Sequence, residues 1–326
     1  MISSLSFTIG LRILMRMLYP HRTALCKGQS YGVRGNLDTM IINGKKMAEG
    51  IKAELAREVA LFEEPPVLGI VQVGDDPVVS RYVGVKKRFG EAIGVGVIHE
   101  QLSASASTEE VVATIERLSF SAQGEPRKVL DELGPRGGHR GLIVQLPLPP
   151  TLDANTILDS ISLEHDVDVL SESACDNFAD GTSIVAPPVV AAIAEIFNLH
   201  HVELQGRRVA VIGYGRLVGK PVSVWLRHEG ALVDIFTKTD DLTDALHDQD
   251  IIISGTGVPG LIAPNMVREG VVLVDVGTSD AEGKLKGDID ATCAPKATLY
   301  TPVPGGVGPL TVAMLFKNLI TLATKQ

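Results

Sequence analysis

A tyrosine and a lysine early in the chain have types and a spacing suited to acid–base chemistry. Tyr82 and Lys86 are four positions apart in a stretch with helical periodicity, so both side chains point from one face. A lysine acts as a general base only when it is neutral, and the positive charges of Lys87 and Arg88 beside it would lower its pKa. The pair is therefore a candidate for catalysis, with a solvated surface Tyr–Lys stack as the alternative.

Three more polar residues lie where a parallel sheet would present them to a ligand. Gln145 ends the apolar run GLIV, and the prolines of the following LPLPP prevent further strand pairing at their positions. An amide at the carboxyl end of a buried strand is well placed for recognition, because ligands of open α/β sheets bind beyond that edge. Asp166 and Asp168 occupy alternate positions in HDVDVL, where a solvated loop is the alternative interpretation.

The string VIGYGRLVGKP, residues 211–221, is typical of a dinucleotide-binding turn. Gly213, Gly215 and Gly219 follow an apolar strand and precede a helix, and their GxGxxxG spacing is one residue longer than the usual GxGxxG. The first two glycines would allow a tight turn and a close approach of phosphate, while the helix N-terminus would supply N–H groups and partial positive charge. A tight strand-to-helix turn without a ligand is the alternative.

The residues that would select the cofactor give conflicting indications for NAD and NADP. An acidic residue about 20 positions after the turn, at the end of the second strand, binds the ribose of NAD. Asp234 has roughly this separation but falls in mid-strand, whereas Lys238 follows the strand end and could attract the extra phosphate of NADP. A solvated surface lysine would fit the same position.

The string TPVPGGVGPLTVAML, residues 301–315, predicts a rigid loop that leads into a helix. Its prolines flank the pair Gly305–Gly306, and Gly308 and Pro309 open the helix. A helix-entry turn does not need three glycines so close together. We therefore expect the backbone of this loop to come close to a ligand.

Alternating apolar runs and amphipathic stretches must position these residues. Apolar residues recur at intervals of four from residue 43 to 62, which predicts a helix, and strand-like runs then alternate with helices up to residue 146 and again from 188 to 277. This pattern predicts an α/β protein with parallel sheets covered on both faces, and 326 residues suffice for two domains, the second Rossmann-like. The polar segment 119–140 is long for a connection and is expected to be a surface insertion.

The composition of the chain argues against several classes of function. A net charge of −9 and a pI near 5.4 argue against nucleic-acid binding, which needs a basic face. The sequence has no run of 18 apolar residues, so no membrane-spanning helix is expected. Cys26, Cys175 and Cys293 are far apart and lack metal-ligand spacing, so we expect reduced cysteines in an intracellular protein without a structural metal.

Residues 1–39 differ in character from the rest of the chain. They carry five basic residues against one acidic residue, and Arg12 and Arg16 interrupt what would be the apolar core of a secretory signal. An Arg- and Ser-rich, acid-poor start could be an organellar transit peptide. The favoured interpretation is an N-terminal extension that is disordered or not native, because Met40 opens a fully patterned domain.

The chain resembles the bifunctional methylenetetrahydrofolate dehydrogenase/methenyltetrahydrofolate cyclohydrolase family of FolD-like proteins. The resemblance rests on five strings in this order: YVGVKKRFGEAIGV, GLIVQLPLPP, HDVDVL, VIGYGRLVGKP and TPVPGGVGPLTVAML. It extends from Met40 to the C-terminus, and QLPLP together with PGGVGP is a highly specific combination. It implies a catalytic folate-binding domain over 40–186 with the C-terminal helix 309–326, a Rossmann-like NAD(P)-binding domain over 187–308, and a cleft between them.

The resemblance also implies roles for individual residues. Lys86 would be the catalytic lysine, oriented and tuned by Gln145, while Tyr82 would stack on the folate and Asp168 would hydrogen-bond its pterin. On the folate side, Pro304 and Gly305 would line the site. The residues that would border the cofactor are Gly213, Tyr214, Gly215, Arg216, Val218, Gly219, Lys238 and Thr311.

The cofactor turn departs from the family pattern. The family often has Gly-Arg-Ser where this chain has Gly213-Tyr214-Gly215, so the arginine that meets the 2′-phosphate of NADP is missing. Arg216 or Lys238 would have to replace it, and the expected cofactor is NADP or NAD. Other departures are Val79 for a serine, VAPP (185–188) for Pro-Cys-Thr-Pro, and HDVDVL for Lys-Asp-Val-Asp-Gly-Phe.

The implied reactions are hydride transfer from 5,10-methylenetetrahydrofolate to NAD(P)+ and hydrolysis of the methenyl product to 10-formyltetrahydrofolate, with neutral Lys86 as general base. The expected partners are tetrahydrofolate derivatives and a second copy of the chain in a homodimer, in cytoplasmic one-carbon metabolism that serves purine biosynthesis. Two alternatives stay open: a cyclohydrolase with weak or lost dehydrogenase activity, and a catalytically silent folate- or nucleotide-binding paralogue. Retention of the Tyr-Lys-Gln-Asp set speaks against the silent paralogue.

Overall fold

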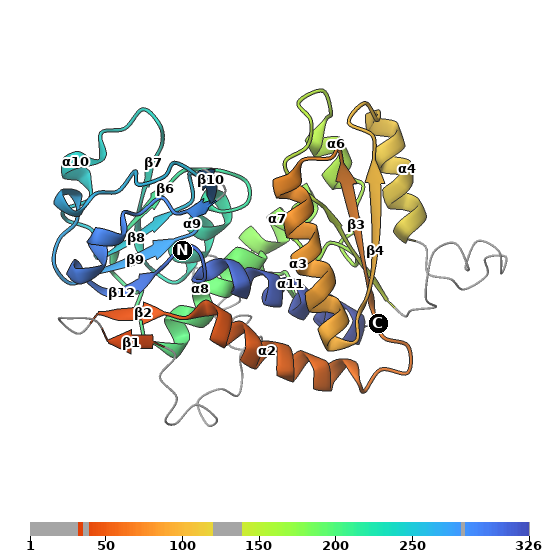
Figure 1. The fold of residues 1–326 in the computed structure, drawn as a ribbon, viewed down its shortest axis with the longest axis horizontal. Helices are drawn as coiled ribbons and strands as arrows, with labels where there is room; N and C mark the ends of the chain where they lie inside the picture. The colour runs from red at the N-terminus through yellow and green to blue at the C-terminus, as the bar shows by residue number, and fades with distance from the viewer. Residues whose placement is uncertain (1–31, 35–38, 120–138, 282–283, 326) are drawn as a thin grey trace, which may run out of the picture. The chain divides into compact units, whose positions relative to one another are not determined.

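The chain forms two compact units, each combining parallel strands with helices (Figure 1). The computed structural model describes residues 32–34, 39–119, 139–281 and 284–325. Unit 1 comprises the described residues up to Ala48, Ala179–Thr182 and Val189–Thr311, and unit 2 comprises Glu49–Phe178, Ser183–Pro188 and the described residues from Val312. The predicted α/β fold class is confirmed.

Unit 2 is built on a three-stranded parallel sheet with the order β4-β3-β5. Its strands are β3 (Val67–Val73), β4 (Gly96–Leu102) and β5 (Arg140–Val144). Every residue of β3 and β5 is buried, the polar Gln72 and Arg140 included, as expected for strands covered on both faces. The carboxyl ends of all three strands meet at one edge of this sheet.

Helices cover both faces of this sheet. They are α2 (Gly44–Val59), α3 (Pro77–Ile93), α4 (Thr108–Ser119), α6 (Ala154–Asp159) and α7 (Glu172–Ala179), joined by the end of α11 (Val307–Thr324). Val71 and Leu142 pack in one core cluster with residues of α4 and α6. Gly141, which alternates with Leu142, faces the other way, because a methyl group there would come within 2.6 Å of Leu319 on α11.

Helix α3, which carries the first candidate residues, has clear start and stop signals. The side chain of Asp76 accepts hydrogen bonds from the backbone N–H groups of Val78 and Val79 at 2.7 and 3.1 Å, and Pro77 occupies the first turn. The helix ends at Gly94, whose φ of 82° lies in the left-handed region that glycine adopts readily.

The C-terminal part of α11 belongs to unit 2. Phe316 stacks on Phe89 of α3 with ring centroids 5.1 Å apart, and Asn318 Nδ2 donates to the carbonyl oxygens of Val167 and Ala186 at 2.9 and 2.8 Å. Among the described helices, α11 alone has the length and apolar composition to cross a membrane. Because 56% of that stretch is buried inside the protein, it has the character of a core helix.

Unit 1 is built on a seven-stranded sheet with the order β1-β2-β12-β9-β8-β6-β7. The strands are β1 (Gly32–Arg34), β2 (Met40–Ile42), β6 (Arg208–Ile212), β7 (Leu232–Phe236), β8 (Ile251–Ser254), β9 (Val271–Asp275) and β12 (Ala297–Thr301). Their pairing is parallel except between β1 and β2. Since β7 and β8 lie on opposite sides of β6, the strand order reverses there, which creates a topological switch point.

The remaining elements of unit 1 connect these strands. They are α8 (Pro188–Leu199), α9 (Gly219–His228), α10 (Leu242–Ala245), the short 3₁₀ helices η1 (Pro264–Met266) and η2 (Ala291–Lys296), and the hairpin of β10 (Ser279–Ala281) and β11 (Lys284–Lys286). Strand β6 and helix α9 flank the predicted dinucleotide turn, as the sequence predicts.

The strand β2 differs from the sequence-based domain assignment. We placed Met40 at the start of the catalytic domain, whereas β2 pairs in parallel with β12 in the sheet of unit 1. A strand of three residues is too short to show a hydrophobic period, and its partner lies at the other end of the chain. Most of the N-terminal extension and the 119–140 insertion lie outside the described residues.

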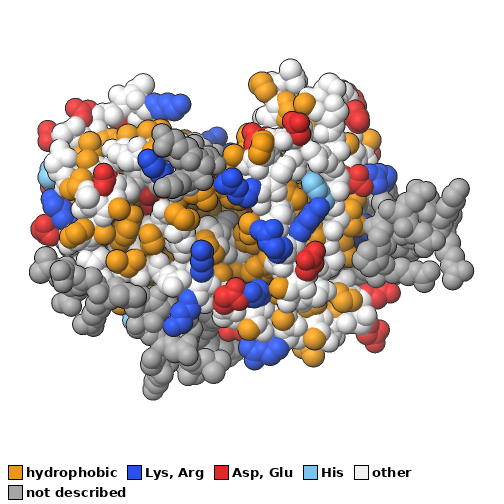
Figure 2. Space-filling model, viewed as in Figure 1, with side chains coloured by type: hydrophobic (Ala, Val, Ile, Leu, Met, Phe, Trp, Pro, Cys, Tyr) orange, Lys and Arg blue, Asp and Glu red, His pale blue; other side chains and the backbone are white. Residues whose placement is uncertain are grey.

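Acidic and basic side chains both lie on the surface of the described parts of the chain. Figure 2 shows acidic and basic side chains interspersed on the face that it views. Cys175 and Cys293 are free thiols, and Cys26 lies outside the described residues. Within those residues, no group of three or more His, Cys, Asp or Glu side chains is arranged to hold a metal ion.

Candidate functional site

Lys86 and Gln145 form the centre of the candidate site in unit 2. Lys86 Nζ donates a 2.6 Å hydrogen bond to Gln145 Oε1, and Gln145 Nε2 donates to the carbonyl oxygen of Leu146 at 3.0 Å. Lys86 comes from α3, and Gln145 follows β5 at the carboxyl edge of the sheet. The second hydrogen bond fixes the amide so that its oxygen faces the lysine.

The protonation of Lys86 is coupled to that of Asp168. Burial lowers the pKa of Lys86, and the negative charge of Asp168 partly opposes this effect. Burial also raises the pKa of Asp168 to about 6, against the opposing charge of Lys86. We expected Lys87 and Arg88 to lower the pKa of Lys86, but burial lowers it instead. Tyr82 is partly buried one turn before Lys86 on the same helix.

Asp166 holds the loop that carries Asp168. Its Oδ2 accepts hydrogen bonds from the backbone N–H groups of Leu170 and Ser171 at 3.0 and 2.9 Å and from Ser171 Oγ at 2.7 Å. Asp166 is only 1% exposed, so the solvated-loop interpretation is wrong for this residue. Burial raises the pKa of Asp166, whereas its hydrogen bonds with Ser171 lower it.

Val169, the neighbour of Asp168, has a strained backbone. Its φ of 57° lies in the left-handed region, which β-branched residues rarely adopt. In the family pattern this position is the glycine of Lys-Asp-Val-Asp-Gly-Phe. Such strain persists only where the surrounding structure imposes it. Here Asn318 holds the carbonyl of Val167 before Val169, and Asp166 holds the backbone N–H groups after it.

In the glycine turn between β6 and α9, neighbouring protein atoms leave little room for side chains at two of the three glycines. Gly213 has a φ of 87°, and a methyl group there would come within 3.1 Å of both the Gly255 oxygen and Thr256 Cγ2. A methyl group at Gly219 would come within 1.9 Å of the Gly213 oxygen. In contrast, a methyl group at Gly215 would have no described atom within 4 Å. Of the three glycines, Gly215 therefore leaves the open space that an approaching phosphate needs.

The start of α9 offers further features of an anion site. Val218 is its N-cap and provides no side-chain acceptor for the N–H groups of the first turn. Tyr214 is 44% exposed, and Lys220 Nζ lies 5.9 Å from the centre of its ring. Arg216 is partly buried in the same turn.

Asp234, the acidic residue of β7, forms a hydrogen bond within the protein. Asp234 Oδ2 accepts a 2.9 Å hydrogen bond from Gln249 Nε2, and its position opposite Ala210 confirms that it lies in mid-strand. Lys238 is exposed just beyond the end of β7. Asp240, also beyond that end, accepts hydrogen bonds from the N–H and Oγ1 of Thr237 at 2.5 and 3.0 Å.

The loop at 302–306 packs against the start of α2. Gly305 has a φ of 107°, and the Gly306 N–H donates to the Pro302 oxygen at 2.7 Å. A methyl group at Gly44 would lie 1.7 Å from the Gly306 oxygen, so only glycine fits where α2 meets this loop, and the predicted approach of the loop to a ligand stays a prediction. Pro304 is exposed beside Gly305.

The structure groups the predicted residues by unit. Unit 2 holds Tyr82, Lys86, Gln145 and Asp168. Unit 1 holds Gly213, Tyr214, Gly215, Arg216, Val218, Gly219, Lys238, Pro304, Gly305 and Thr311. Thr311 donates its hydroxyl to the Val307 oxygen at 3.2 Å within α11.

Two buried carboxylates at the carboxyl edge of the unit 1 sheet were missed by sequence reasoning. Asp275 ends β9, and Asp288 follows β11; each is 1% exposed. Burial raises the pKa of Asp275 to about 7, and the charge of Asp288 contributes. The only signals in the sequence were Gly277 and Gly287, each of which leaves room for one of these carboxylates.

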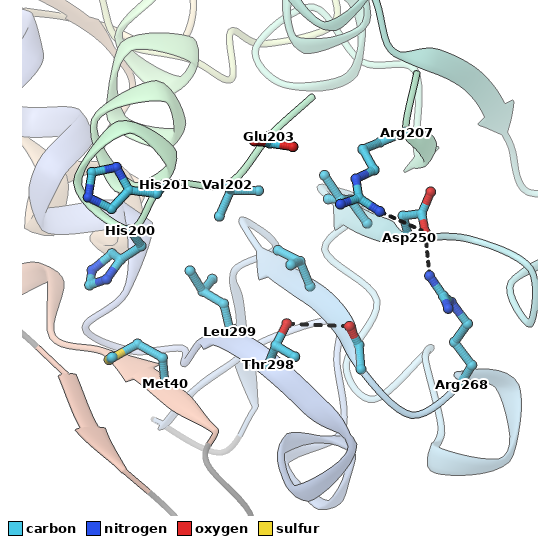
Figure 3. Close-up of a pocket in the computed structure, with 13 residues that line it drawn as sticks. Met40, His200, His201, Val202, Glu203, Arg207, Asp250, Arg268, Thr298 and Leu299 are labelled. Carbon is cyan, nitrogen blue, oxygen red and sulfur yellow. Dashed lines mark hydrogen bonds and ion pairs between the residues drawn. The ribbon is translucent and has the colours of Figure 1, made fainter. Parts of the chain in front are cut away.

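A cavity of about 650 Å³ lies at the opposite edge of the unit 1 sheet (Figure 3). Arg207, Asp250 and Gly270, which line it, come directly before β6, β8 and β9. Arg207 and Arg268 both form ion pairs with Asp250. Because it lies at the amino ends of the strands, this cavity is separate from the glycine turn.

Two family models match most of the chain. Residues 42–168 match the catalytic domain of tetrahydrofolate dehydrogenase/cyclohydrolase, and residues 187–326 match its NAD(P)-binding domain. The chain belongs to the tetrahydrofolate dehydrogenase/cyclohydrolase family. The resemblance inferred from the five strings is thereby confirmed.

Individual members of the tetrahydrofolate dehydrogenase/cyclohydrolase family match over nearly their whole length. The bifunctional protein FolD of Lactobacillus gasseri is 34% identical over 291 residues, which are 88% of this chain and 98% of that protein. The crystal structure of the bifunctional enzyme FolD from Campylobacter jejuni is 30% identical with a TM-score of 0.79, covering 88% of this chain and 99% of that one. The Trypanosoma brucei enzyme, solved with NADP cofactor and an inhibitor, has the same identity and TM-score and covers 88% and 98%.

Proposed function

We propose that this chain oxidises 5,10-methylenetetrahydrofolate with NAD(P)+ and hydrolyses the methenyl product to 10-formyltetrahydrofolate. Membership of the tetrahydrofolate dehydrogenase/cyclohydrolase family supports both reactions. The observation that carries the proposal is the hydrogen bond between Lys86 and Gln145. It orients an amine whose pKa is lowered by burial, so this lysine is suited to act as a base.

Hydrolysis needs a base that takes a proton from the attacking water. Neutral Lys86 supplies a lone pair on Nζ, and its hydrogen bond to the Gln145 oxygen orients the amine. Water oxygen forms a bond to the methenyl carbon while its proton passes to Nζ and the electrons of the C=N double bond move onto nitrogen. The bond between this carbon and N5 then breaks, and N5 takes up the proton, which leaves the formyl group on N10. In this proposal Asp168 hydrogen-bonds the pterin and Tyr82 stacks on the folate.

Oxidation mainly requires that the methylene carbon be held in position against the acceptor. Bound NAD(P)+ supplies the hydride acceptor. The residues present fit a dinucleotide, because Gly215 leaves open space in the turn and α9 begins without a side-chain cap. The proposed cofactor-binding residues are Gly213, Tyr214, Gly215, Arg216, Val218, Gly219, Lys238 and Thr311, with Pro304 and Gly305 on the folate side.

We propose weak discrimination between NADP+ and NAD+. Tyr214 stands where the family often has the arginine for the 2′-phosphate, which removes one source of preference for NADP+. Asp234 is bonded to Gln249, so it is not free to bind the ribose of NAD+ as the acidic residue of this fold does. We propose Lys238 and Arg216 as the cations for the extra phosphate.

The proposed setting is a cytoplasmic homodimer in one-carbon metabolism that serves purine biosynthesis. One feature supports association of two copies. Strand β7 is an edge of the unit 1 sheet, and its Leu232 is 60% exposed.

Spectroscopic assays test the proposal. Oxidation is followed with methylenetetrahydrofolate and either nucleotide, and hydrolysis with the methenyl substrate. We expect Lys86→Ala to reduce hydrolysis by about 10²- to 10⁴-fold, the usual contribution of a general base, without changing nucleotide binding. Lys87→Ala, one position along the same helix, is the matched control and should retain both activities.

Three results would count against the proposal or part of it. Absence of both activities in the wild-type protein would overturn it. Hydrolysis without oxidation by either nucleotide would favour the cyclohydrolase alternative, which the replacement at Tyr214 makes the second candidate. Survival of hydrolysis in Lys86→Ala would overturn the assignment of the base.

A further inference from the structure

Asp288 joins two segments at the carboxyl edge of the unit 1 sheet. Its Oδ2 accepts hydrogen bonds from Ser254 Oγ at 2.7 Å, from the Thr256 N–H at 2.7 Å and from Thr256 Oγ1 at 2.9 Å. Ser254 is the last residue of β8, and Thr256 belongs to the loop that follows it. A single carboxylate oxygen therefore fixes the end of β8 and the start of its loop.

The backbone around Asp288 is anchored to the neighbouring strand. The Asp288 N–H donates to Asp275 Oδ1 at 3.1 Å, and the Ile289 N–H donates to Asp275 Oδ2 at 2.8 Å. Because Asp275 ends β9, Asp288 is held to β9 through its backbone and to β8 through its side chain. A methyl group at Gly277 would come within 2.0 Å of Asp288 Oδ1, so the carboxylate occupies the space that this glycine leaves.

The loop that Asp288 holds lies directly against the glycine turn. A methyl group at Gly213 would come within 3.1 Å of Thr256 Cγ2, and one at Gly255 would come within 2.6 Å of Val218 Cγ1. Gly255 and Thr256 thus form a wall of the turn on the β8 side of the switch point. A shift of this loop would change the space around Gly213 and Val218.

The other oxygen of Asp288 is buried and has no hydrogen-bond partner among the residues that the structure describes. An unpartnered buried oxygen lowers stability, because the group loses its hydration without compensation. The three hydrogen bonds that Oδ2 accepts therefore have to offset the cost of burying Oδ1. Hydrogen bonds to a charged acceptor are shorter and stronger than neutral ones, so a carboxylate fixes the loop more firmly than a neutral group would.

We propose that Asp288 is a positioning residue for the dinucleotide, acting through the loop 254–257 on the shape of the glycine turn. The proposal rests on the proposed function, since it assumes that the turn binds NAD(P)+. Asp288 acts on the turn through Thr256, which it binds, and through the adjoining Gly255. It takes no part in the hydrolysis chemistry, which belongs to residues of unit 2.

The first test compares Asp288→Ala and Asp288→Asn with the wild-type protein. We expect Asp288→Ala to raise the dissociation constant of NADP+, measured by calorimetry, by about 10-fold or more, the scale of lost hydrogen bonds to a charged group. Exchange of the Thr256 amide hydrogen should also become faster. Asp288→Asn should recover part of the affinity, because its amide oxygen can accept from the same donors.

The matched control is Asp290→Ala, two positions along the chain. Asp290 is exposed and accepts hydrogen bonds from the N–H and Oγ1 of Thr292 at the start of η2, so it caps a different element. This variant should leave the NADP+ dissociation constant and Thr256 exchange unchanged. An effect equal to that of Asp288→Ala would show that any nearby carboxylate matters, and would overturn the proposal.

A second variant tests the same link from the donor side. Thr256→Val removes the hydroxyl donor and keeps the shape of the side chain, so we expect a smaller loss of NADP+ affinity in the same direction. In the Asp288→Ala background it should have little further effect, because the acceptor is already gone. Fully additive losses would overturn the link, and if Asp288→Ala fails to fold, unchanged affinity in Thr256→Val alone would overturn it.

Hydrolysis of the methenyl substrate separates positioning from general damage, because it needs no nucleotide. Equal loss of hydrolysis and of NADP+ affinity in Asp288→Ala would indicate a merely structural role and overturn the proposal. A wild-type protein without either activity would instead refute the proposed function. If the wild-type protein turns over and Asp288→Ala binds NADP+ normally, only the positioning role fails.

Discussion

Lys86 Nζ donates a 2.6 Å hydrogen bond to Gln145 Oε1, although the two residues are 59 positions apart in the chain. The acceptor is a neutral amide, so it orients the amine without adding a charge that would hold the proton on it. Burial is then free to lower the lysine pKa, opposed only in part by Asp168. In the proposed mechanism, glutamine at this position supplies an uncharged partner for the lysine.

Gln145→Glu should therefore impair hydrolysis in a pH-dependent way. The new carboxylate would stabilise the charged lysine and raise its pKa, so hydrolysis at pH 7 should fall by about 10-fold or more and its profile should shift to higher pH. The pH dependence of kcat for hydrolysis measures this. Gln101→Glu changes an exposed glutamine on β4 of the same unit and should leave the profile unchanged. An unshifted profile in Gln145→Glu would contradict the role of the neutral amide.

Tyr214→Arg should shift cofactor preference toward NADP+. An arginine there can form charge-assisted hydrogen bonds with the 2′-phosphate, which corresponds to about 1–3 kcal/mol in the ratio of kcat/KM for NADP+ and NAD+. Leu217→Arg is the matched control, since Leu217 is 45% exposed in the same turn and Tyr214 is 44% exposed. An unchanged ratio in Tyr214→Arg, or an equal shift in the control, would show that another group handles the phosphate.

Replacing Val169 with glycine should cost less stability than replacing it with alanine. Both replacements remove the buried side chain, but only glycine adopts a φ of 57° without strain, so Val169→Gly should be about 1 kcal/mol more stable than Val169→Ala. Thermal unfolding followed by circular dichroism measures the difference. At Val111, which is buried in helix α4, the order should be reversed, because alanine favours helix over glycine. The same order at both positions would contradict strain at Val169.

Asp275 should make unit 1 less stable as the pH rises. Its pKa of about 7 in the folded protein exceeds the ordinary value of 3.8, so the folded state holds the proton more tightly. Its contribution is fully present below about pH 4 and is lost as the pH rises through about 7, at up to about 1.4 kcal/mol per pH unit. Urea unfolding followed by the fluorescence of Trp225, which is buried in unit 1, measures this dependence.

Asp275→Asn should flatten the stability profile between pH 4 and 7, because the asparagine does not titrate. Asp290→Asn is the control with the opposite sign: hydrogen bonds from Thr292 lower the pKa of Asp290, so its effect is confined to more acidic pH. A wild-type profile that does not fall across this range, or one that Asp275→Asn leaves unchanged, would contradict the raised pKa.

Much of the fold could be predicted from the sequence because its signals are local. The buried run of β3, the Asp76 cap of α3 and the glycine turn after β6 all lie within one element or its ends. In contrast, β2 was assigned to the other domain, because its place in the unit 1 sheet comes from pairing with β12, which lies at the far end of the chain. No local period reveals such a pairing.

The residue types of the candidate site could likewise be predicted, and some of their physical causes could not. The Tyr82–Lys86 spacing and the position of Gln145 follow from helix and strand geometry, but burial as the cause of the lowered lysine pKa depends on the packing of the whole unit. The roles of Asp166 and Asp288 depend on hydrogen bonds to backbone groups that only the folded chain brings within reach.

The sequence by itself determined the alternation of strands and helices, the glycine turn and the side chains able to do the chemistry, because these depend on residue type and short-range spacing. Only the tertiary structure decided which carboxylates are buried, that Val169 is strained, and that Gly44 lies against the loop at Gly306. Burial, strain and close approach are produced by residues distant in the chain, so no local pattern contains them.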